Sequence, residues 1–570
     1  MVNDLQQSLK NSIIDGSFAQ SMSTLTGGLF LTGFVMAIGG NSYHIGVASS
    51  IPLFSNLFQL VASYLIERSG ARKKICVTAC MVARSMWFIF ALLPILYIYR
   101  PELKEEILWA AIGVYALNAL AAAFAGISWV SWMKDLVPAG QRGKYFGLRS
   151  TVTSISGLVV GFLFGRFLDA MKNFGTTYYL MAYFTLFLSA FICGALSTIY
   201  LKKVEEPEYL ILAGSEKPGL WAFIKMLILP FKNRQFRNAM LINAAFTFAC
   251  NIASPFFNLY ILRELEVSFT MMAIYDVINL MANISTFSVW GRLIDRLGNK
   301  PILLITTFFG AALPIIMVFA TKENAWLLIP LFELTTGLVW SGINLATSNI
   351  FMKLAPSERG SIYLSLNSAL NGILSSLGPI LGGYMAYRLK SEKLTLNFSY
   401  LLSPENAGYG FTFQIANLQF IFLISVLLRL TGSYLFKYVE EPESKPFKNV
   451  VRLLTHARGF ALTTFNYALI YDYFNSGMEK ITNIEDKVIN RVKKLRGNLF
   501  TKKMNNSSIN NGPADIKLKN TEIVKNEQIN IEPLKNETTN NEITELKDSE
   551  IKTNEEKSSE MPDIKNQNIP

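Results

Sequence analysis

Long apolar runs recur along the chain and constrain its fold more than any other feature. The hydrocarbon core of a bilayer requires about 20 apolar residues per helix, because only helices and closed barrels satisfy every backbone hydrogen bond there. The runs in the first part of the chain are Phe18–Gly39, His44–Ile66, Ile75–Tyr97, Ile107–Trp132, Tyr145–Leu168 and Tyr178–Leu201. Those in the second part are Arg237–Leu262, Ser268–Trp290, Ile302–Ala320, Ala325–Met352, Ser361–Tyr387 and Phe411–Phe436. The sequence therefore predicts an all-α membrane protein with twelve transmembrane helices.

The composition agrees with this interpretation. Hydrophobic residues make up 51% of the 570 positions and charged residues only 16%, a balance that is too apolar for an ordinary soluble protein. The formal net charge of +12 raises the question of a nucleic-acid partner. Topology explains much of that charge, because short loops on one side of a membrane bundle are rich in Lys and Arg. We expect the partner to be the lipid bilayer and no nucleic acid.

Basic residues gather in alternate loops. The loops after the second, fourth, eighth and tenth runs carry Arg68, Arg72, Lys73, Lys74, Lys134, Arg142, Lys144, Arg296, Lys300, Lys353 and Arg359. The loop at Gly40–Tyr43, after the first run, carries none. Cytoplasmic loops show such an excess of positive charge. We therefore expect the basic loops and both termini in the cytoplasm, with the bundle in the plasma (inner) membrane.

Three short motifs occur twice, in the same order. KKVEEPE at Lys202–Glu208 returns as KYVEEPE at Lys437–Glu443, and each copy closes an apolar run. LVPAGQRG at Leu136–Gly143 corresponds to LAPSERG at Leu354–Gly360. ERSGARKK, which ends at Lys74, corresponds to DRLGNK, which ends at Lys300. Ordered pairs of motifs indicate an internal repeat, so the twelve helices divide into two six-helix halves.

The third pair of motifs resembles the signature of the major facilitator superfamily, Gly-x-x-x-Asp-Arg-x-Gly-Arg/Lys-Arg/Lys. The second half supplies Gly291, Asp295, Arg296, Gly298 and Lys300, with Asn299 in one basic place. The first half supplies Glu67, Arg68, Gly70, Arg72 and Lys73, with Ser63 in the place of the leading glycine, Glu67 in that of the aspartate and one residue of slippage. The resemblance covers Phe18–Glu443 and implies two lobes around a central cavity.

The resemblance also implies a gate built from the signature carboxylates. A carboxylate can accept hydrogen bonds from the free N–H groups at a helix N-terminus, where the helix dipole favours negative charge. In the family, this contact joins the two halves on the cytoplasmic side. Carried over, Glu67 would meet the eleventh helix and Asp295 the fifth. The alternative is that both are solvated loop charges.

Charged residues within the predicted helices are candidates for substrate binding or coupling. Each costs about 3 kcal/mol or more at the bilayer centre unless it faces a cavity or a partner. Arg84 lies near the middle of the third helix, Asp276 about two turns into the eighth and Glu333 about two turns into the tenth. We expect Glu333 in the cavity, because the family's tenth helix lines it. The alternative for Glu333 is a structural ion pair or an interfacial position, and that for Arg84 is a structural hydrogen bond to neighbouring carbonyls. Asp276 lies nearer the outer surface.

Other chemistry is sparse. Asn251, close to Pro255 in the seventh helix, predicts a broken, solvent-lined stretch. The four cysteines (Cys76, Cys80, Cys193 and Cys250) and two histidines (His44 and His456) show neither metal-ligand spacing nor a disulfide framework. A Walker-type phosphate loop is also missing from the sequence. We expect no cofactor, no metal and no enzymatic activity.

The sequence divides into six segments. They are a cytoplasmic N-terminus (1–17), a first six-helix half (18–204), a central cytoplasmic loop (205–236), a second six-helix half (237–444), a segment with interfacial helical character (445–501) and a disordered cytoplasmic tail (502–570). Within the fifth segment, Val450–Phe474 mixes aromatics with charges, which favours an interfacial helix over a thirteenth span. The tail is polar and has few large side chains.

The resemblance implies a secondary carrier that moves a small solute by rocking its halves about a midplane site. We expect it to act as a monomer. Proton coupling through Glu333, with Asp276 as the second candidate, is a further hypothesis. The alternative function is a receptor or scaffold on the same fold, with the tail binding a partner.

Overall fold

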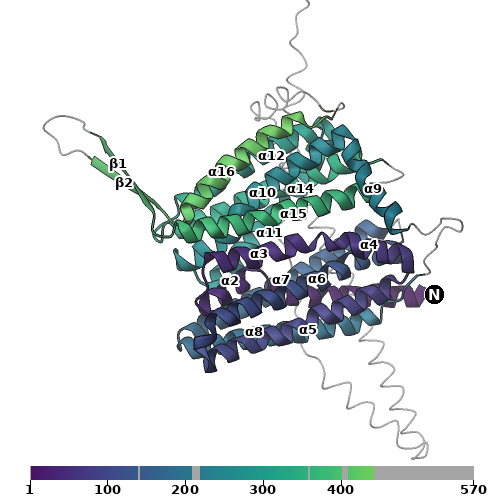
Figure 1. Ribbon diagram of the computed structural model, residues 1–570, viewed down its shortest axis with the longest axis horizontal. Coiled ribbons are helices and arrows are strands. Elements are labelled where there is room, and N and C mark those ends of the chain that lie inside the picture. Colours follow the sequence, from purple (N-terminus) through teal and green to yellow (C-terminus); the bar gives the residue numbers. More distant parts are fainter. Residues whose placement is uncertain are drawn as a thin grey trace, which may run out of the picture. The chain divides into compact units, whose positions relative to one another are not determined.

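The computed structural model describes residues 2–138, 141–207, 219–356, 360–400, 409–441 and 444 (Figure 1). The first half consists of α1 (Val2–Leu25), α2 (Gly28–Ala37), α3 (Ser42–Ser55), α4 (Phe58–Ser69), α5 (Arg72–Tyr99), η1 (Pro101–Leu103), α6 (Lys104–Leu136), α7 (Arg142–Lys172) and α8 (Thr176–Lys202). The short helix α9 (Leu220–Lys232) precedes the second half. The segments 445–501 and 502–570, including Val450–Phe474, lie outside the described residues, so the expectations for them stay predictions.

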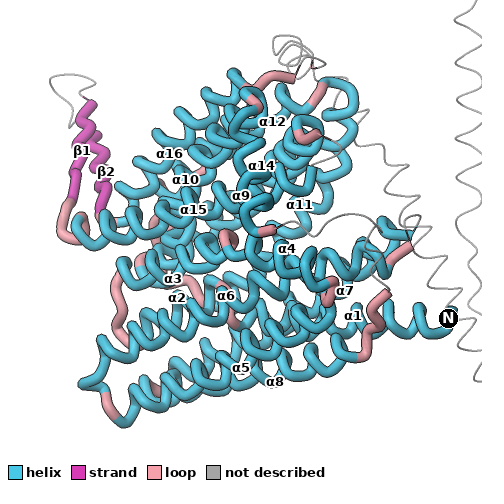
Figure 2. The backbone as a smooth tube through the Cα atoms, turned by 45° about the vertical axis from the view of Figure 1, so that its right-hand side comes forward, coloured by secondary structure: helices cyan, strands magenta, loops and turns pink. Residues whose placement is uncertain are grey.

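The second half also contains six spans and adds a β-hairpin. Its helices are α10 (Arg234–Arg263), α11 (Phe269–Leu297), α12 (Asn299–Ala312), α13 (Pro314–Val318), α14 (Ala325–Leu354), α15 (Gly360–Arg388), α16 (Leu418–Leu435) and η3 (Phe436–Tyr438). The strands β1 (Lys393–Tyr400) and β2 (Tyr409–Ala416) form an antiparallel hairpin between α15 and α16. Figure 2 shows the hairpin projecting from the helical bundle.

The predicted spans match the observed helices. Ten segments among the described residues are long and apolar enough to cross a membrane. The two other expected spans correspond to α1–α2 and to α15. The predicted fold class, an all-α membrane bundle, is confirmed.

The predicted start of the twelfth span is wrong. The twelfth span was expected to begin at Phe411, but 411–416 belong to β2 and the helix begins at Leu418. Aromatic and β-branched residues alternate with polar ones in this stretch, a pattern that favours a strand. Asn417, with a φ of 48°, ends the strand before the helix begins.

Three spans are interrupted in ways that the apolar pattern did not predict. The first breaks between Leu25 and Gly28, the second between Ser55 and Phe58, and the ninth at Leu313, between α12 and α13. The helix that contains the first expected span also begins well before Phe18, because α1 runs from Val2; the cytoplasmic position of 1–17 stays a prediction.

The two halves meet chiefly along two pairs of helices. In Figures 1 and 2, α3 lies beside α15, and the contacts also join α7 to α11. Small residues allow the first approach, since a Cβ on Gly383 would lie 2.8 Å from the carbonyl oxygen of Ser42. Lipid tails are as apolar as these helices, so close packing of small residues, and not the hydrophobic effect, stabilises such contacts.

The repeated VEEPE motif caps a helix in each half. Glu206 accepts the backbone N–H of Lys73 at 3.0 Å, in the first turn of α5. Glu441 accepts the backbone N–H of Lys300 at 2.7 Å, in the first turn of α12. These N–H groups have no partner within their own helix, and the helix dipole favours a carboxylate there. The motif is therefore repeated because each half contains the same helix start.

The ion pairs around the two caps differ. In the first half, Arg72 pairs with Asp135 and lies 3.9 Å from Glu206. In the second half, Asn299 takes the equivalent helix position and donates to Glu441 at 2.7 Å. The cation there is Lys353, at the end of α14, 3.1 Å from Glu441. The positive charge has thus moved from one helix to the next between the halves.

These contacts predict that Glu441→Ala lowers the stability of the second half by about 1–3 kcal/mol, since it removes a helix cap and leaves Lys353 without this ion pair. Burial opposes ionisation of Glu441, but hydrogen bonds from Asn299, Lys300 and Lys353 outweigh it and lower its pKa below the ordinary 4.5. The stabilisation should therefore be complete above that ordinary value and lost as the pH falls through the lowered one.

Thermal unfolding of the detergent-solubilised chain measures this effect. Glu440→Gln is the matched control, because this exposed neighbour in the same motif contacts only Gln235 among the described residues. An equal loss of stability in both variants would contradict the assigned role of Glu441.

Candidate functional site

The signature carboxylates lie at the end of the bundle that carries the basic loops, hereafter the basic end. Glu67 and Asp295 are both exposed, and within the described residues neither forms an ion pair or hydrogen bond. The start of the eleventh helix adjoins residues 357–359, which lie outside the described part of the chain. The expected gate stays a prediction.

The signature glycines have different roles. Gly70 and Gly298 adopt φ values of +69° and +93°, which L side chains rarely adopt, and each ends a helix. Gly291 is not crowded, since the nearest atom to a Cβ there would be a Leu345 methyl at 3.9 Å. Arg68 contacts Tyr64 at 3.5 Å. The first two glycines are thus required by the backbone, and Gly291 has no such steric reason.

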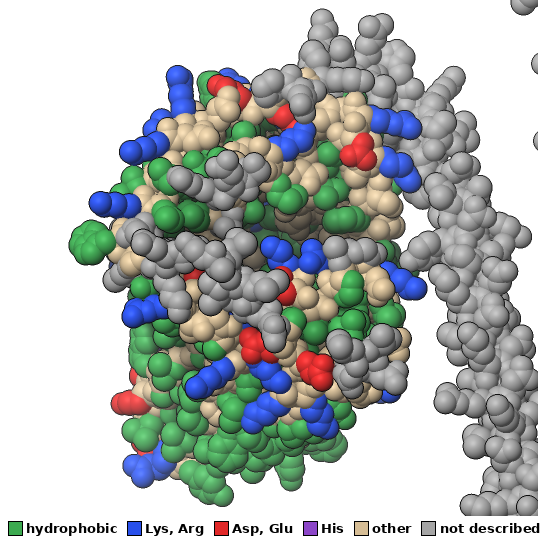
Figure 3. Space-filling view, turned by 90° about the vertical axis from the view of Figure 1, so that its right-hand side faces the viewer, with side chains coloured by type: hydrophobic (Ala, Val, Ile, Leu, Met, Phe, Trp, Pro, Cys, Tyr) green, Lys and Arg blue, Asp and Glu red, His purple; other side chains and the backbone are tan. Residues whose placement is uncertain are grey.

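Asp295, Arg296 and Gly298 line a cavity of about 500 Å³ at the basic end, together with Asn349 and Lys353. Figure 3 looks onto this end, and Lys and Arg side chains are distributed over it. The wall of this cavity therefore carries charged groups of both signs. A gate that forms and breaks ion pairs requires such groups.

The opposite end of the bundle holds a contact between the halves that sequence analysis missed. Asp169, in the last turn of α7, accepts the backbone N–H groups of Phe269 at 3.0 Å and Thr270 at 2.8 Å. It also accepts the Thr270 hydroxyl at 2.5 Å. The carboxylate of one half therefore caps the first turn of α11 in the other half. We call this contact the Asp169 clasp.

Glu333 and Asp276 lie on adjacent helices of the second half. Glu333, on α14, is half-buried and accepts a hydrogen bond from the Asn279 amide of α11 at 2.9 Å. Asp276 lies one turn before Asn279 on the same helix. The carboxylates of Glu333 and Asp276 repel each other. Asp276 lines a cavity of about 230 Å³ with Gln20 and Thr24 of the first half. The structure thus brings together the two residues that the sequence singled out separately.

Arg84 lies in a polar network within the first half. Its guanidinium donates to the Thr198 hydroxyl at 2.6 Å and lies 3.7 Å from the carboxylate of Asp15. Asp15 is only 2% exposed and also accepts the Ser197 hydroxyl at 2.5 Å. Sequence analysis missed Asp15 because it placed the start of the first span at Phe18. The sequence feature that could have indicated a buried carboxylate was Asp15 itself, an isolated acidic residue three positions before the apolar run that begins at Phe18.

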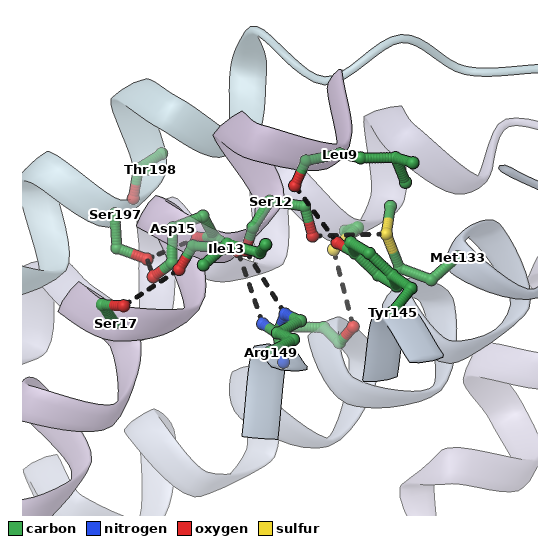
Figure 4. A network of polar contacts seen from close by, with 12 residues as sticks. Leu9, Ser12, Ile13, Asp15, Ser17, Met133, Tyr145, Arg149, Ser197 and Thr198 are labelled. Atoms are coloured by element: carbon green, nitrogen blue, oxygen red, sulfur yellow. Dashed lines mark hydrogen bonds and ion pairs between the residues drawn. The ribbon is translucent and has the colours of Figure 1, made fainter. Parts of the chain in front are cut away.

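A second arginine reaches the same carboxylate. Arg149, on α7, lies 3.9 Å from Asp15 and donates to the backbone oxygen of Ser12 at 3.3 Å (Figure 4). Its guanidinium also lies over the Trp129 ring, 4.3 Å from the ring centroid. A Cβ on Gly16 would clash with this guanidinium, so glycine makes the approach of Arg149 possible.

Asn251 has a local role. Its amide donates to the backbone oxygen of Thr247 at 2.8 Å in the same helix. The break expected near Pro255 is absent, because α10 is continuous from Arg234 to Arg263. Thr247 contacts Asn371 and Ser375 of α15, so this polar group joins two helices of one half.

Comparisons with known proteins agree with this architecture. A family model described as Major Facilitator Superfamily matches residues 16–379 and 239–478. A probable peptide/nitrate transporter of Arabidopsis thaliana is 35% identical over 98 residues, which cover 17% of this chain and 19% of that relative. The match thus spans about a fifth of the relative's length.

Solved structures share the fold at low identity. A D-xylose–proton symporter has a TM-score of 0.55 at 14% identity, covering 77% of this chain and 98% of that one. A variant of the nucleoside transporter NupG has a TM-score of 0.53 at 13% identity, covering 77% and 100%. A bacterial homologue of the iron transporter ferroportin, in an inward-facing state, has a TM-score of 0.52 at 13% identity, with the same coverage.

Identities this low establish the fold alone. The family model, in contrast, spans well over half of the chain and includes both signature loops. On this match, and on its two related six-helix halves, the chain belongs to the major facilitator superfamily.

Proposed function

We propose that the chain is a secondary carrier that moves a small solute by alternating access, seen with the end opposite the basic loops closed. The Asp169 clasp carries this proposal, because it joins the two halves at that end through three hydrogen bonds. The close approach of α3 and α15 at Gly383 supports it. At the basic end, the described residues include no bond from either signature carboxylate to the other half.

The same proposal sets the orientation. Short loops rich in Lys and Arg face the cytoplasm, so the basic end and both termini would be cytoplasmic and the Asp169 clasp would face outward in the plasma membrane. We also propose action as a monomer, because one chain contains both six-helix halves that alternating access requires.

Proton coupling is the second part of the proposal. Glu333 is a half-buried carboxyl group beside Asp276, with Asn279 as a hydrogen-bond donor. A proton bound by one carboxyl group removes the repulsion between the two. Glu333 would thus bind and release the proton, and the negative charge of Asp276 would favour the protonated form of Glu333.

The Asp169 clasp predicts a shift in conformation. Asp169→Ala removes all three hydrogen bonds across the halves, at a cost of about 1–2 kcal/mol to the closed state. That cost corresponds to about a 5–30-fold change in population. A single cysteine at Met36, in the wall of the cavity beside the clasp, should then react faster with a membrane-impermeant thiol reagent.

Two features make this measurement specific. The four native cysteines are first replaced, and Glu266→Gln serves as the control, because Glu266 is exposed at the same end and pairs with Lys322 of its own half. Unchanged labelling in Asp169→Ala, or equal acceleration in the control, would show that the clasp does not hold this end closed.

Glu333→Gln tests coupling. A glutamine cannot carry the proton, so solute exchange without a gradient should persist while accumulation driven by a pH gradient fails. Uptake into proteoliposomes, with a solute found by a thermal-stabilisation screen, measures both. Glu264→Gln is the control, because this half-exposed carboxylate directly after α10 pairs with the neighbouring Arg263. Unchanged accumulation in Glu333→Gln would remove this residue from the mechanism, and Asp276→Asn would then be measured in the same assay.

Truncation after Lys502 separates a carrier from a scaffold. A carrier keeps its solute flux, because the two halves and every candidate site lie before that residue. Absence of flux for any solute, together with loss of a binding partner on truncation, would instead favour the receptor or scaffold function.

A further inference from the structure

A cavity of about 430 Å³ lies within the first half where two of its spans are interrupted. Thr26 and Gly27, at the break between α1 and α2, line it, as does Asn56, at the break between α3 and α4. Non-helical backbone at membrane depth is found where it is buried in protein or lines a cavity. Broken helices also mark binding sites in several other transporter folds.

The wall of this cavity is polar and partly aromatic. Asn56, Gln59 and Asn118 contribute amides, and Trp87 and Tyr115 contribute rings whose centroids lie 6.0 Å apart. The helix α2 begins at the cavity, and in the described part of the chain no side chain caps its first turn. A helix start of this kind favours negative charge. The volume is that of a small-molecule site.

The cation in the wall is Arg84, which is only 7% exposed. A guanidinium has five N–H donors. One guanidinium nitrogen of Arg84 donates a hydrogen bond to the Thr198 hydroxyl, and another lies 3.7 Å from the Asp15 carboxylate. Gly194 makes room for the Arg84 stem, since a Cβ there would lie 3.1 Å from it. Arg84 thus keeps donors beyond its protein partners and is held where it lines the cavity.

The local charges do not balance. Asp15 is the one carboxylate within ion-pair distance of Arg84 and Arg149 in the described part of the chain. Both separations, 3.7 Å and 3.9 Å, exceed the roughly 2.7–2.9 Å of a charge-assisted hydrogen bond. One carboxylate therefore faces two guanidiniums, whose side chains are 9% and 18% exposed, so the surplus is a positive charge largely shielded from water. Such a charge is costly unless an anion accompanies it.

We infer that this cavity binds a small monovalent anion, inorganic or carboxylate, with Arg84 as its counter-ion. The inference rests on the proposed carrier function and names the class of solute. The anion would occupy the space between Arg84, the start of α2 and the amide of Asn56, while the amide N–H of Gln59 is donated to Asn56 and Gln59 only borders this space. It would offset the surplus charge without displacing Asp15.

The test uses the purified full chain in lipid nanodiscs and follows thermal unfolding. The anionic probes are the sodium salts of nitrate, dihydrogen phosphate, acetate and benzoate, and the uncharged probes are glucose and uridine. Gln59→Glu places a negative charge in the wall at nearly constant shape. Gln59→Met is the matched neutral control, because it loses the same hydrogen bond to Asn56. Arg84→Gln is the direct variant.

At least one anion should raise the unfolding temperature of the wild type in a saturable manner. Its Kd should rise at least tenfold in Gln59→Glu and in Arg84→Gln, and stay within about threefold in Gln59→Met. If Arg84→Gln does not fold, the comparison at Gln59 decides alone. Stabilisation by the uncharged probes only, by no probe, or equally in Gln59→Glu and Gln59→Met would overturn the inference.

Uptake of the stabilising anion into proteoliposomes distinguishes the two proposals. Anion binding without flux would reject the carrier function and keep the site. Flux of an uncharged solute without anion binding would reject the site and keep the carrier function.

Discussion

The bilayer provides no hydrogen bonds to a polypeptide backbone, so every helix end near it must find its own partners. Three carboxylates serve this need. Glu206 and Glu441 cap helix starts within their own halves, and Asp169 caps a helix start in the other half. The first two join segments within one half. The third is the kind of bond that a rocking motion has to break, because its donor and acceptor belong to different halves.

The repeat shows which features of a half depend on geometry and which do not. The capping glutamate keeps its place in both copies, since the free N–H of an equivalent helix start fixes where a carboxylate must lie. The cation near the capping glutamate does not keep its place. It is Arg72, on the capped helix, in the first half and Lys353, on a neighbouring helix, in the second. A charge acts over several ångströms, whereas a hydrogen bond requires one position.

Polar groups are distributed unequally between the halves. The first half places the buried Arg84 and the half-buried Arg149 beside one aspartate, and the second places two carboxylates on adjacent helices, with an amide between them. The first arrangement favours a negative ligand and the second favours a proton. The two proposals therefore concern different halves, and each can be tested without the other.

The sequence by itself determined the twelve spans, their division into two halves and the basic end, because span length, repeated motifs and loop charge are local properties. It failed at Phe411, where alternating aromatics in a hairpin looked like a continuous apolar run. Only the tertiary structure decided which polar groups meet. Asp15 and Ser197 are 182 positions apart, and Asp169 and Thr270 are 101 apart. Such pairs depend on how helices rotate and pack, which no single segment encodes.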